Sequence, residues 1–327
     1  MRWRLWLQTA SARTTEARLD PKRLSRVTGT SQSENVRTLE VSEEELARRR
    51  AERQERPYDM SRLSYAGTFK NPFKANTIRA IEWLTAKVTL LRLIRQFERT
   101  GAPVGAPFWP KAIKQMGITI QTPPEEIALI PKEGPVVLVS NHPSGLVDGM
   151  VLAEMVARVR SDFKILTRSL LTGIPEVEEF MIPVPFPHED NARELGLQMR
   201  DETMKHLKAG GVIILFPAGK VAMSEGWWGP AVEAEWNVFT HKMVRTSGAT
   251  IVPMRFTGQN SRAFLIANKL SDTLRQGLLL YEIKRALFKP QRPYIGQPIP
   301  ASELDKWEGN PRGFLAWLRE HTLSLGG

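Results

Sequence analysis

The sequence contains no cysteine among its 327 residues. This absence excludes a disulfide scaffold, a thiol nucleophile and a zinc site with cysteine ligands, and it suits a reducing compartment. The chain also lacks an uninterrupted apolar run of about 18 residues, so no transmembrane helix is predicted. Its opening segment, MRWRLWLQTASA, has too short an apolar core for a secretory signal. We therefore expect a cytoplasmic protein, peripheral on the inner face of the cell membrane.

Acidic residues are in the minority, with 35 Asp and Glu against 46 Lys and Arg, for a formal net charge of +11. This balance indicates an anionic partner, which nucleic acid, an acidic membrane surface or an anionic substrate would each provide. The sequence has neither a G-x-G-x-x-G nor a G-x-x-x-x-G-K-[ST] nucleotide loop. We expect no cofactor and no metal.

Composition divides the chain into two parts. Residues 1–75 are highly charged and poor in large apolar side chains, which predicts a basic, largely disordered leader. Residues 76–327 are predicted to form the folded domain. That domain opens with a basic and apolar helix over residues 77–100, whose apolar positions do not share one side of a helical wheel. Its Arg and Lys content is typical of a helix that docks on anionic head groups, and packing against the core is the alternative.

Apolar segments beyond Gly134 alternate with helical patterns. Strands are predicted at 135–140, 163–167, 181–185, 212–216 and 250–256, and helices near 148–160, 192–209 and 230–247. This order predicts an α/β fold, with a mostly parallel mixed β-sheet flanked by helices on both faces. Functional sites in such sheets form at the carboxyl ends of the strands.

One predicted strand ends in polar residues that could perform chemistry. The segment PVVLVSNHPSGLVDG places Asn141 and His142 directly after the strand and Asp148 six residues beyond the histidine. A histidine can take a proton from a hydroxyl as that hydroxyl attacks a carbonyl carbon. A carboxylate that accepts from Nδ1 would fix the tautomer of the ring and stabilise the imidazolium. We assign His142 as the base and Asp148 as its orienting partner, although this spacing alone is a weak signal.

Three blocks together resemble the lysophospholipid acyltransferase family, which includes the 1-acylglycerol-3-phosphate acyltransferases. Asn141-His142 with Asp148 resembles its N-H-x-x-x-x-D block, Leu215–Gly219 its F-P-E-G-T-R-S block, and Ile251–Met254 its V-P-V block. The resemblance covers roughly residues 80–300. It implies transfer of a fatty acyl group from acyl-CoA or acyl carrier protein to a hydroxyl of a lysophospholipid or lyso-aminolipid in membrane lipid synthesis. Membrane lipids are the implied partners, and no nucleic acid is expected.

The chain departs from the family pattern at several positions. Five residues, not four, separate His142 from Asp148, and Gly145 can absorb the extra residue by adopting a positive φ. Ala218 stands where the family has glutamate and Val221 where it has arginine, which puts lysophosphatidate itself in doubt. The remaining pattern, with G-Q-N-S at 258–261, looks more like a divergent bacterial branch that includes hemolysin-like and ornithine-lipid acyltransferases. The residues expected to bind substrate are Asn141, Gly145, Pro217, Gly219, Lys220 and Arg168, with His188 as a weaker candidate.

Rival interpretations use some of the same residues. Ser144 is a possible nucleophile, but the G-x-S-x-G elbow is missing. His142, Asp148 and the cluster 188–190 offer imidazole and carboxylate ligands for a metal hydrolase, at a spacing that matches no known metal motif. Trp227-Trp228 within a basic chain suggests base stacking in a nucleic-acid-binding protein, or contact with lipid. A basic nucleic-acid- or lipid-binding protein without catalysis therefore stays open as the alternative.

Overall fold

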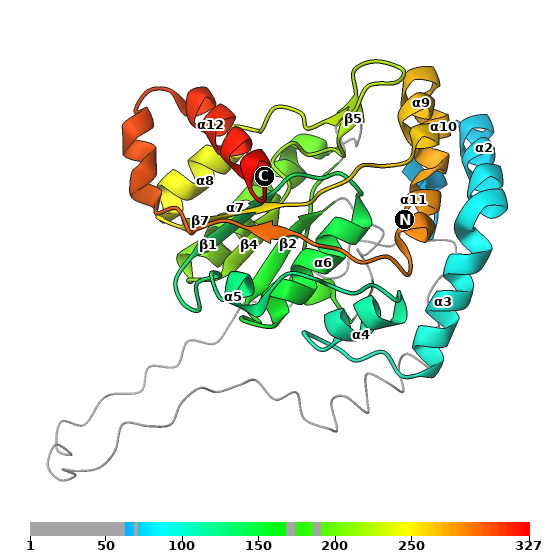
Figure 1. Cartoon of the computed structure of the whole chain (residues 1–327), viewed down its shortest axis with the longest axis horizontal. Coiled ribbons are helices and arrows are strands. Elements are labelled where there is room, and N and C mark those ends of the chain that lie inside the picture. The colour runs from blue at the N-terminus through cyan, green and yellow to red at the C-terminus, as the bar shows by residue number, and fades with distance from the viewer. Residues whose placement is uncertain (1–62, 69–70, 168–173, 175, 186–190) are drawn as a thin grey trace, which may run out of the picture. The chain divides into compact units, whose positions relative to one another are not determined.

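A mixed β-sheet forms the centre of the protein, which we describe from a computed structural model covering residues 63–68, 71–167, 174, 176–185 and 191–327 (Figure 1). The strands lie in the order β3-β2-β4-β1-β7-β8. Their bounds are Val136–Ser140 (β1), Phe163–Thr167 (β2), Met181–Pro183 (β3), Val212–Leu215 (β4), Thr250–Arg255 (β7) and Tyr294–Ile295 (β8). Neighbouring strands are parallel, except that β8 runs antiparallel to β7. The predicted α/β class, with a mostly parallel sheet, is confirmed.

Strand β1 is buried on both faces, as its unbroken apolar sequence requires. Val136 and Leu138 pack in one layer, which includes α4 (Phe108–Gln115) and α6 (Leu146–Ala157). Val137 and Val139 point to the other layer, with side chains from α7 (Ala192–Lys208), α8 (Phe239–Ser247) and α12 (Pro311–Ser324). Each fully buried Val or Leu contributes about 1.5–3 kcal/mol, so this strand anchors the residues that follow it.

A long helical segment precedes the sheet. It comprises α2 (Pro72–Glu82), a π-helical turn η2 (Trp83–Lys87) and α3 (Val88–Arg99). The side chain of Asn71 caps α2 by accepting hydrogen bonds from the backbone N–H groups of Phe73 and Lys74 at 2.9 and 3.2 Å. The helix therefore starts at Pro72 and not at residue 77 as predicted.

This helical segment is buried on one side and exposed on the other. Ile78 and Leu90 are buried, and α2 packs along α10 (Asp272–Gly277). In contrast, Phe73, Trp83 and Leu84 are 79%, 62% and 87% exposed. Core packing accounts for the first set and leaves the exposed apolar side chains unexplained. No helix in the described ranges has the length and apolar character needed to span a bilayer.

The packed part of the chain begins before residue 76, where the folded domain was expected to start. Leu63 is buried, and Glu82 of α2 accepts hydrogen bonds from Ser64 Oγ at 2.6 Å and from the Tyr65 N–H at 2.7 Å. Burial raises the pKa of the Glu82 carboxyl. The predicted boundary at residue 75 is therefore too late, and the rest of the predicted leader, residues 1–62, lies outside the described residues.

The helix predicted for residues 230–247 is correct only in its second half. Strand β6 (Ala231–Val232) comes first and pairs antiparallel with β5 (Met223–Ser224), forming a short hairpin before α8. Apart from the early start of the helix predicted at 77–100, the other predicted helices and strands agree with the structure to within three residues. The remaining elements are η1 (Tyr65–Thr68), α5 (Pro124–Ile127), η3 (Glu178–Phe180), α9 (Arg262–Leu270), α11 (Leu279–Ala286) and η4 (Ala301–Trp307).

Candidate active site

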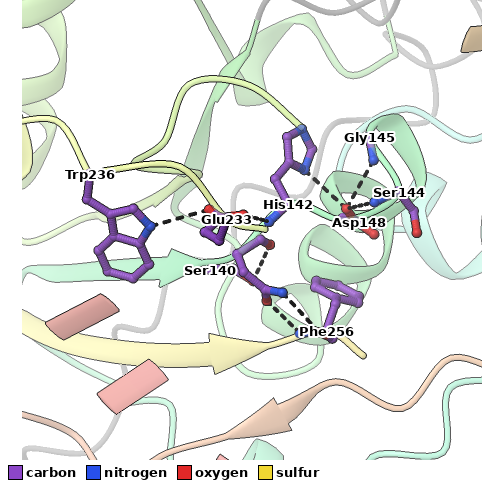
Figure 2. Close-up of polar contacts among 9 residues, drawn as sticks. Ser140, His142, Ser144, Gly145, Asp148, Glu233, Trp236 and Phe256 are labelled. Carbon is purple, nitrogen blue, oxygen red and sulfur yellow. Dashed lines mark hydrogen bonds and ion pairs between the residues drawn. The ribbon is translucent and has the colours of Figure 1, made fainter. Parts of the chain in front are cut away.

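The site lies at the carboxyl end of β1, between the ends of β4 and β7. His142 Nδ1 is 3.1 Å from Asp148 Oδ2 (Figure 2). The same oxygen accepts hydrogen bonds from the backbone N–H groups of Ser144 at 2.8 Å and Gly145 at 3.1 Å, and Asp148 is fully buried. A buried carboxylate with these donors is held in one orientation, so the direction of the imidazole is fixed as well.

Gly145 allows the longer spacing between the histidine and the aspartate. It is the N-cap of α6, with φ 82° and ψ −130°, a conformation that is essentially restricted to glycine. A Cβ at this position would meet only Val221 Cγ1, at an ordinary 3.5 Å. The backbone angle, and not a lack of space, is therefore the reason for glycine here.

The imidazole of His142 is held from several sides. Its ring stacks on Phe216, with centroids 3.8 Å apart and planes 20° apart. The backbone of His142 is held as well. Its carbonyl accepts a hydrogen bond from the Ala222 N–H at 2.9 Å, and its backbone N–H donates to Glu233 Oε2 at 3.2 Å. Among the described residues, none hydrogen-bonds to Nε2, and the side chain is 18% exposed. Nε2 is therefore the ring nitrogen available to a substrate.

Asn141, expected to bind substrate, is engaged within the fold. Its Nδ2 donates to the Phe256 carbonyl at 2.9 Å and its Oδ1 accepts from the Phe256 N–H at 2.8 Å. The amide thus continues the pairing of β1 with β7 beyond the last strand residue. This contact favours a scaffolding role for Asn141 over contact with substrate.

The F-P-A-G block lies beside the N-H block, as its position after β4 predicts. Phe216 to Gly219 forms a turn closed by a 2.9 Å hydrogen bond from the Gly219 N–H to the Phe216 carbonyl, and Gly219 has φ 65°. Pro217 is buried, whereas Lys220 is exposed. The N–H groups of Gly145 and Gly219 are both used within the chain, so neither is left to stabilise an oxyanion. Arg168 and His188 lie outside the described residues.

Glu233 belongs to the site, although the sequence did not indicate it. Its carboxylate accepts from the His142 N–H and, at 3.3 Å, from Trp236 Nε1, while an Arg319 guanidinium N–H donates to its carbonyl. Burial raises the pKa of the Glu233 carboxyl. The residue is 91 positions from His142 and follows β6, within the segment predicted to be helical. The β5–β6 hairpin brings Glu233 back to the site, and the contact follows from that hairpin.

The rival site chemistries find little support in the geometry. Ser144 bonds Asp148 through its backbone N–H, and no hydrogen bond joins its hydroxyl to His142. In the part of the chain that the structure describes, no group of three or more His, Asp or Glu side chains could hold a metal ion. The cluster 188–190 falls outside that part.

A protein-family model described as Acyltransferase matches residues 125–257. These residues form an acyltransferase-family domain. The matched range contains β1, the turn after β4, all of β7 and all three sequence blocks, so the resemblance seen in the sequence is confirmed. The acyltransferase domain also contains Glu233, which no block includes.

Two bacterial proteins align with about half of this chain. The lyso-glycine lipid O-acyltransferase of Phocaeicola vulgatus is 29% identical over 189 residues, covering 54% of this chain and 63% of that protein. The protein of the same name from Bacteroides thetaiotaomicron is 27% identical over 189 residues, covering 54% and 65%. The chain thus spans just under two thirds of the length of these relatives. The crystal structure of the 1-acyl-sn-glycerophosphate (LPA) acyltransferase PlsC from Thermotoga maritima aligns with a TM-score of 0.43 and 14% identity, over 79% of this chain and 83% of that one.

Proposed function

We propose that this chain transfers a fatty acyl group from a thioester, on coenzyme A or acyl carrier protein, to the hydroxyl of a lysolipid. The observation that carries this proposal is the 3.1 Å contact between His142 Nδ1 and Asp148 at the end of β1, within the acyltransferase-family domain. The contact supplies the oriented base that the reaction needs, and it forms despite the extra residue in the loop.

The proposed reaction follows from the tautomer that Asp148 selects. With Nδ1–H donating to the carboxylate, Nε2 carries the lone pair and takes the proton of the lipid hydroxyl as its oxygen attacks the thioester carbonyl. The C–O bond forms and the C–S bond breaks. The imidazolium then returns its proton to the departing sulfur, so ester and free thiol are the products. No residue of the chain is acylated in this scheme.

A lyso-aminolipid is the acceptor class that we favour. Ala218 and Val221 occupy the positions where the family carries a glutamate and an arginine, and Val221 Cγ1 lies against Gly145. An aliphatic side chain cannot make the bidentate contact that a guanidinium makes with phosphate. The names of the two relatives point to the same class, since both are described as acting on a lyso-glycine lipid. We further propose peripheral membrane association at the cytoplasmic face, because the acceptor resides in a bilayer.

A panel assay tests this proposal. Purified protein is incubated with lyso-glycine lipid, lyso-ornithine lipid or lysophosphatidate and with acyl-CoA or acyl carrier protein, and the lipids are analysed by mass spectrometry. We expect one acceptor class to gain one acyl chain, with release of an equal amount of thiol.

The His142→Ala variant is the matched control for this assay. Loss of the base is expected to lower turnover by about 10²- to 10⁴-fold, while the far-UV spectrum and the melting curve stay those of the wild type. Activity of His142→Ala within a few-fold of the wild type, or no product from any pair in the panel, would refute the proposal.

A further inference from the structure

The hairpin between β5 and β6 exposes two adjacent tryptophans. Trp227 is 51% exposed and Trp228 is 78% exposed. Neither contributes to the described hydrophobic clusters of the core. Single exposed apolar side chains are ordinary, but adjacent large ones form a patch of the kind that marks an interaction site.

Hydrogen bonds from α9 and the loop before it hold the hairpin in place. Lys269 Nζ donates to the Glu225 carbonyl at 2.5 Å, and the Arg262 guanidinium donates to the Gly229 carbonyl at 2.6 Å. Gln259 Oε1 accepts from the Ala231 N–H at 2.9 Å. The bonded backbone groups lie before and after the two tryptophans in the chain, so the backbone that carries both indoles is held in place.

Two further exposed apolar side chains belong to the same end of the molecule. Leu270, 62% exposed, ends α9 and directly follows Lys269. Helix α10 then runs alongside α2, with Gly277 packed against Ile81, and Phe73, 79% exposed, lies in the first turn of α2. Figure 1 shows the tip of the hairpin, α9 and the start of α2 together at the upper right. We call Phe73, Trp227, Trp228 and Leu270 the docking rim.

We propose that the docking rim inserts into the surface of an anionic bilayer, an inference that rests on the proposed function. Tryptophan suits this interface because its ring is apolar and its N–H finds polar partners among the head groups. Lys74 and Arg79 on α2 are exposed beside the rim, and the whole chain carries a net charge of +11. Cationic side chains flanking apolar anchors match a negatively charged lipid surface.

The hairpin links the docking rim to the candidate active site. Its return strand, β6, leads directly to Glu233, which bonds the His142 N–H. Glu233 is five positions beyond Trp228, a span of at most about 18 Å along an extended chain. Insertion of the indoles therefore brings the histidine close to the head-group layer, where the hydroxyl of a lysolipid acceptor lies.

Vesicle flotation tests the docking rim, with phosphatidylcholine vesicles that either contain or lack phosphatidylglycerol. We expect the wild type to bind the anionic vesicles and the W227S/W228S variant to bind them at least about tenfold more weakly. Phe288→Ser is the matched control, because Phe288 is 73% exposed and lies at the far end of α11 from the hairpin. This control is expected to bind within about twofold of the wild type.

A second assay separates the failure of docking from the failure of the proposed function. Acyl transfer is measured with the acceptor dispersed in detergent micelles, where we expect the wild type and W227S/W228S to be equally active. Wild-type protein that does not float, equal flotation of wild type and W227S/W228S, or an equal loss in Phe288→Ser would each overturn the docking rim. Tryptophan-dependent flotation without acyl transfer would support the docking rim and reject the proposed reaction.

Discussion

The two tryptophans of the docking rim precede the short strand β6, Glu233 of the candidate active site follows it, and the rim and the site are built in opposite ways. In the site, Asp148 and Glu233 are buried carboxyl groups that accept hydrogen bonds from donors of the same chain. In the rim, Trp228 and Phe73 are exposed apolar side chains. A buried polar group must be satisfied within the protein, whereas an exposed apolar group gains free energy when something else covers it. Asp148 Oδ2 and the Glu233 carboxyl therefore already have partners within the chain, whereas the rim needs a partner from outside.

Asp148→Asn should have the largest effect on the site side of this comparison. Oδ2 alone accepts from the N–H groups of Ser144 and Gly145 and faces Nδ1, so an asparagine that places its amide oxygen there can still make all three contacts. It loses the negative charge that stabilises the imidazolium, which is the contribution assigned to Asp148. We expect turnover to fall by about 10²- to 10⁴-fold with the melting temperature changed by only a few degrees. Steady-state kinetics and thermal unfolding measure the two quantities. Activity close to the wild type would show that Asp148 only caps α6.

Gly145→Ala should have an intermediate effect, on both stability and activity. The alanine must leave a glycine-only backbone conformation or bear the strain, at a cost of about 1–3 kcal/mol. The N–H groups that hold Asp148 would move with it, so activity should fall further than stability alone explains. The matched control is Gly248→Ala, at φ 65° after α8, where nothing lies within 4 Å of the added Cβ. Denaturant titration and steady-state kinetics of both variants measure stability and activity. An equal loss of activity in the two variants would contradict the role of Gly145.

Glu233→Gln should have the smallest effect and a distinct pH dependence. Because burial raises the pKa of Glu233 in the folded protein, the folded state binds this proton more tightly than the unfolded state. The wild type therefore loses stability from this group as the pH rises from the ordinary carboxyl pKa through the raised one. The glutamine variant lacks that loss. The stability of the glutamine variant relative to the wild type is therefore expected to increase with pH. Its turnover is expected to fall several-fold, because the charged acceptor of the His142 backbone N–H is lost.

The measurement for Glu233 is chemical denaturation at an acidic and at a neutral pH. Glu235→Gln is the matched control, since Glu235 is exposed and lies two residues away in the same segment. A relative stability of Glu233→Gln that is independent of pH, or that follows Glu235→Gln, would reject the proposed linkage.

The parts of the fold that the sequence predicts are those determined by neighbours along the chain. Strands β1 and β7 are continuous apolar runs, and His142 and Asp148 are close enough in sequence to meet across one turn. Glu233 could not be predicted, because its buried position depends on a hairpin whose two strands have only two residues each. Strands this short show no hydrophobic periodicity in the sequence. For the same reason, the segment before α8 was expected to be helical. The start of α2 carried a recognisable signal in Asn71 and the proline that follows it.

The π-helical turn at Trp83–Lys87 explains why the apolar residues of the long helix fit no single wheel. Ile78 and Leu90 are both buried, yet they would lie about 120° apart on a straight α-helix. A turn with i to i+5 hydrogen bonds absorbs one extra residue and brings the two positions back to within about 20° of each other. One continuous rod can thus rest on α10 at its start and on α4 and α11 further along. The extra residue in the π-helical turn thus changes which side chains face the core while the helix continues without a break.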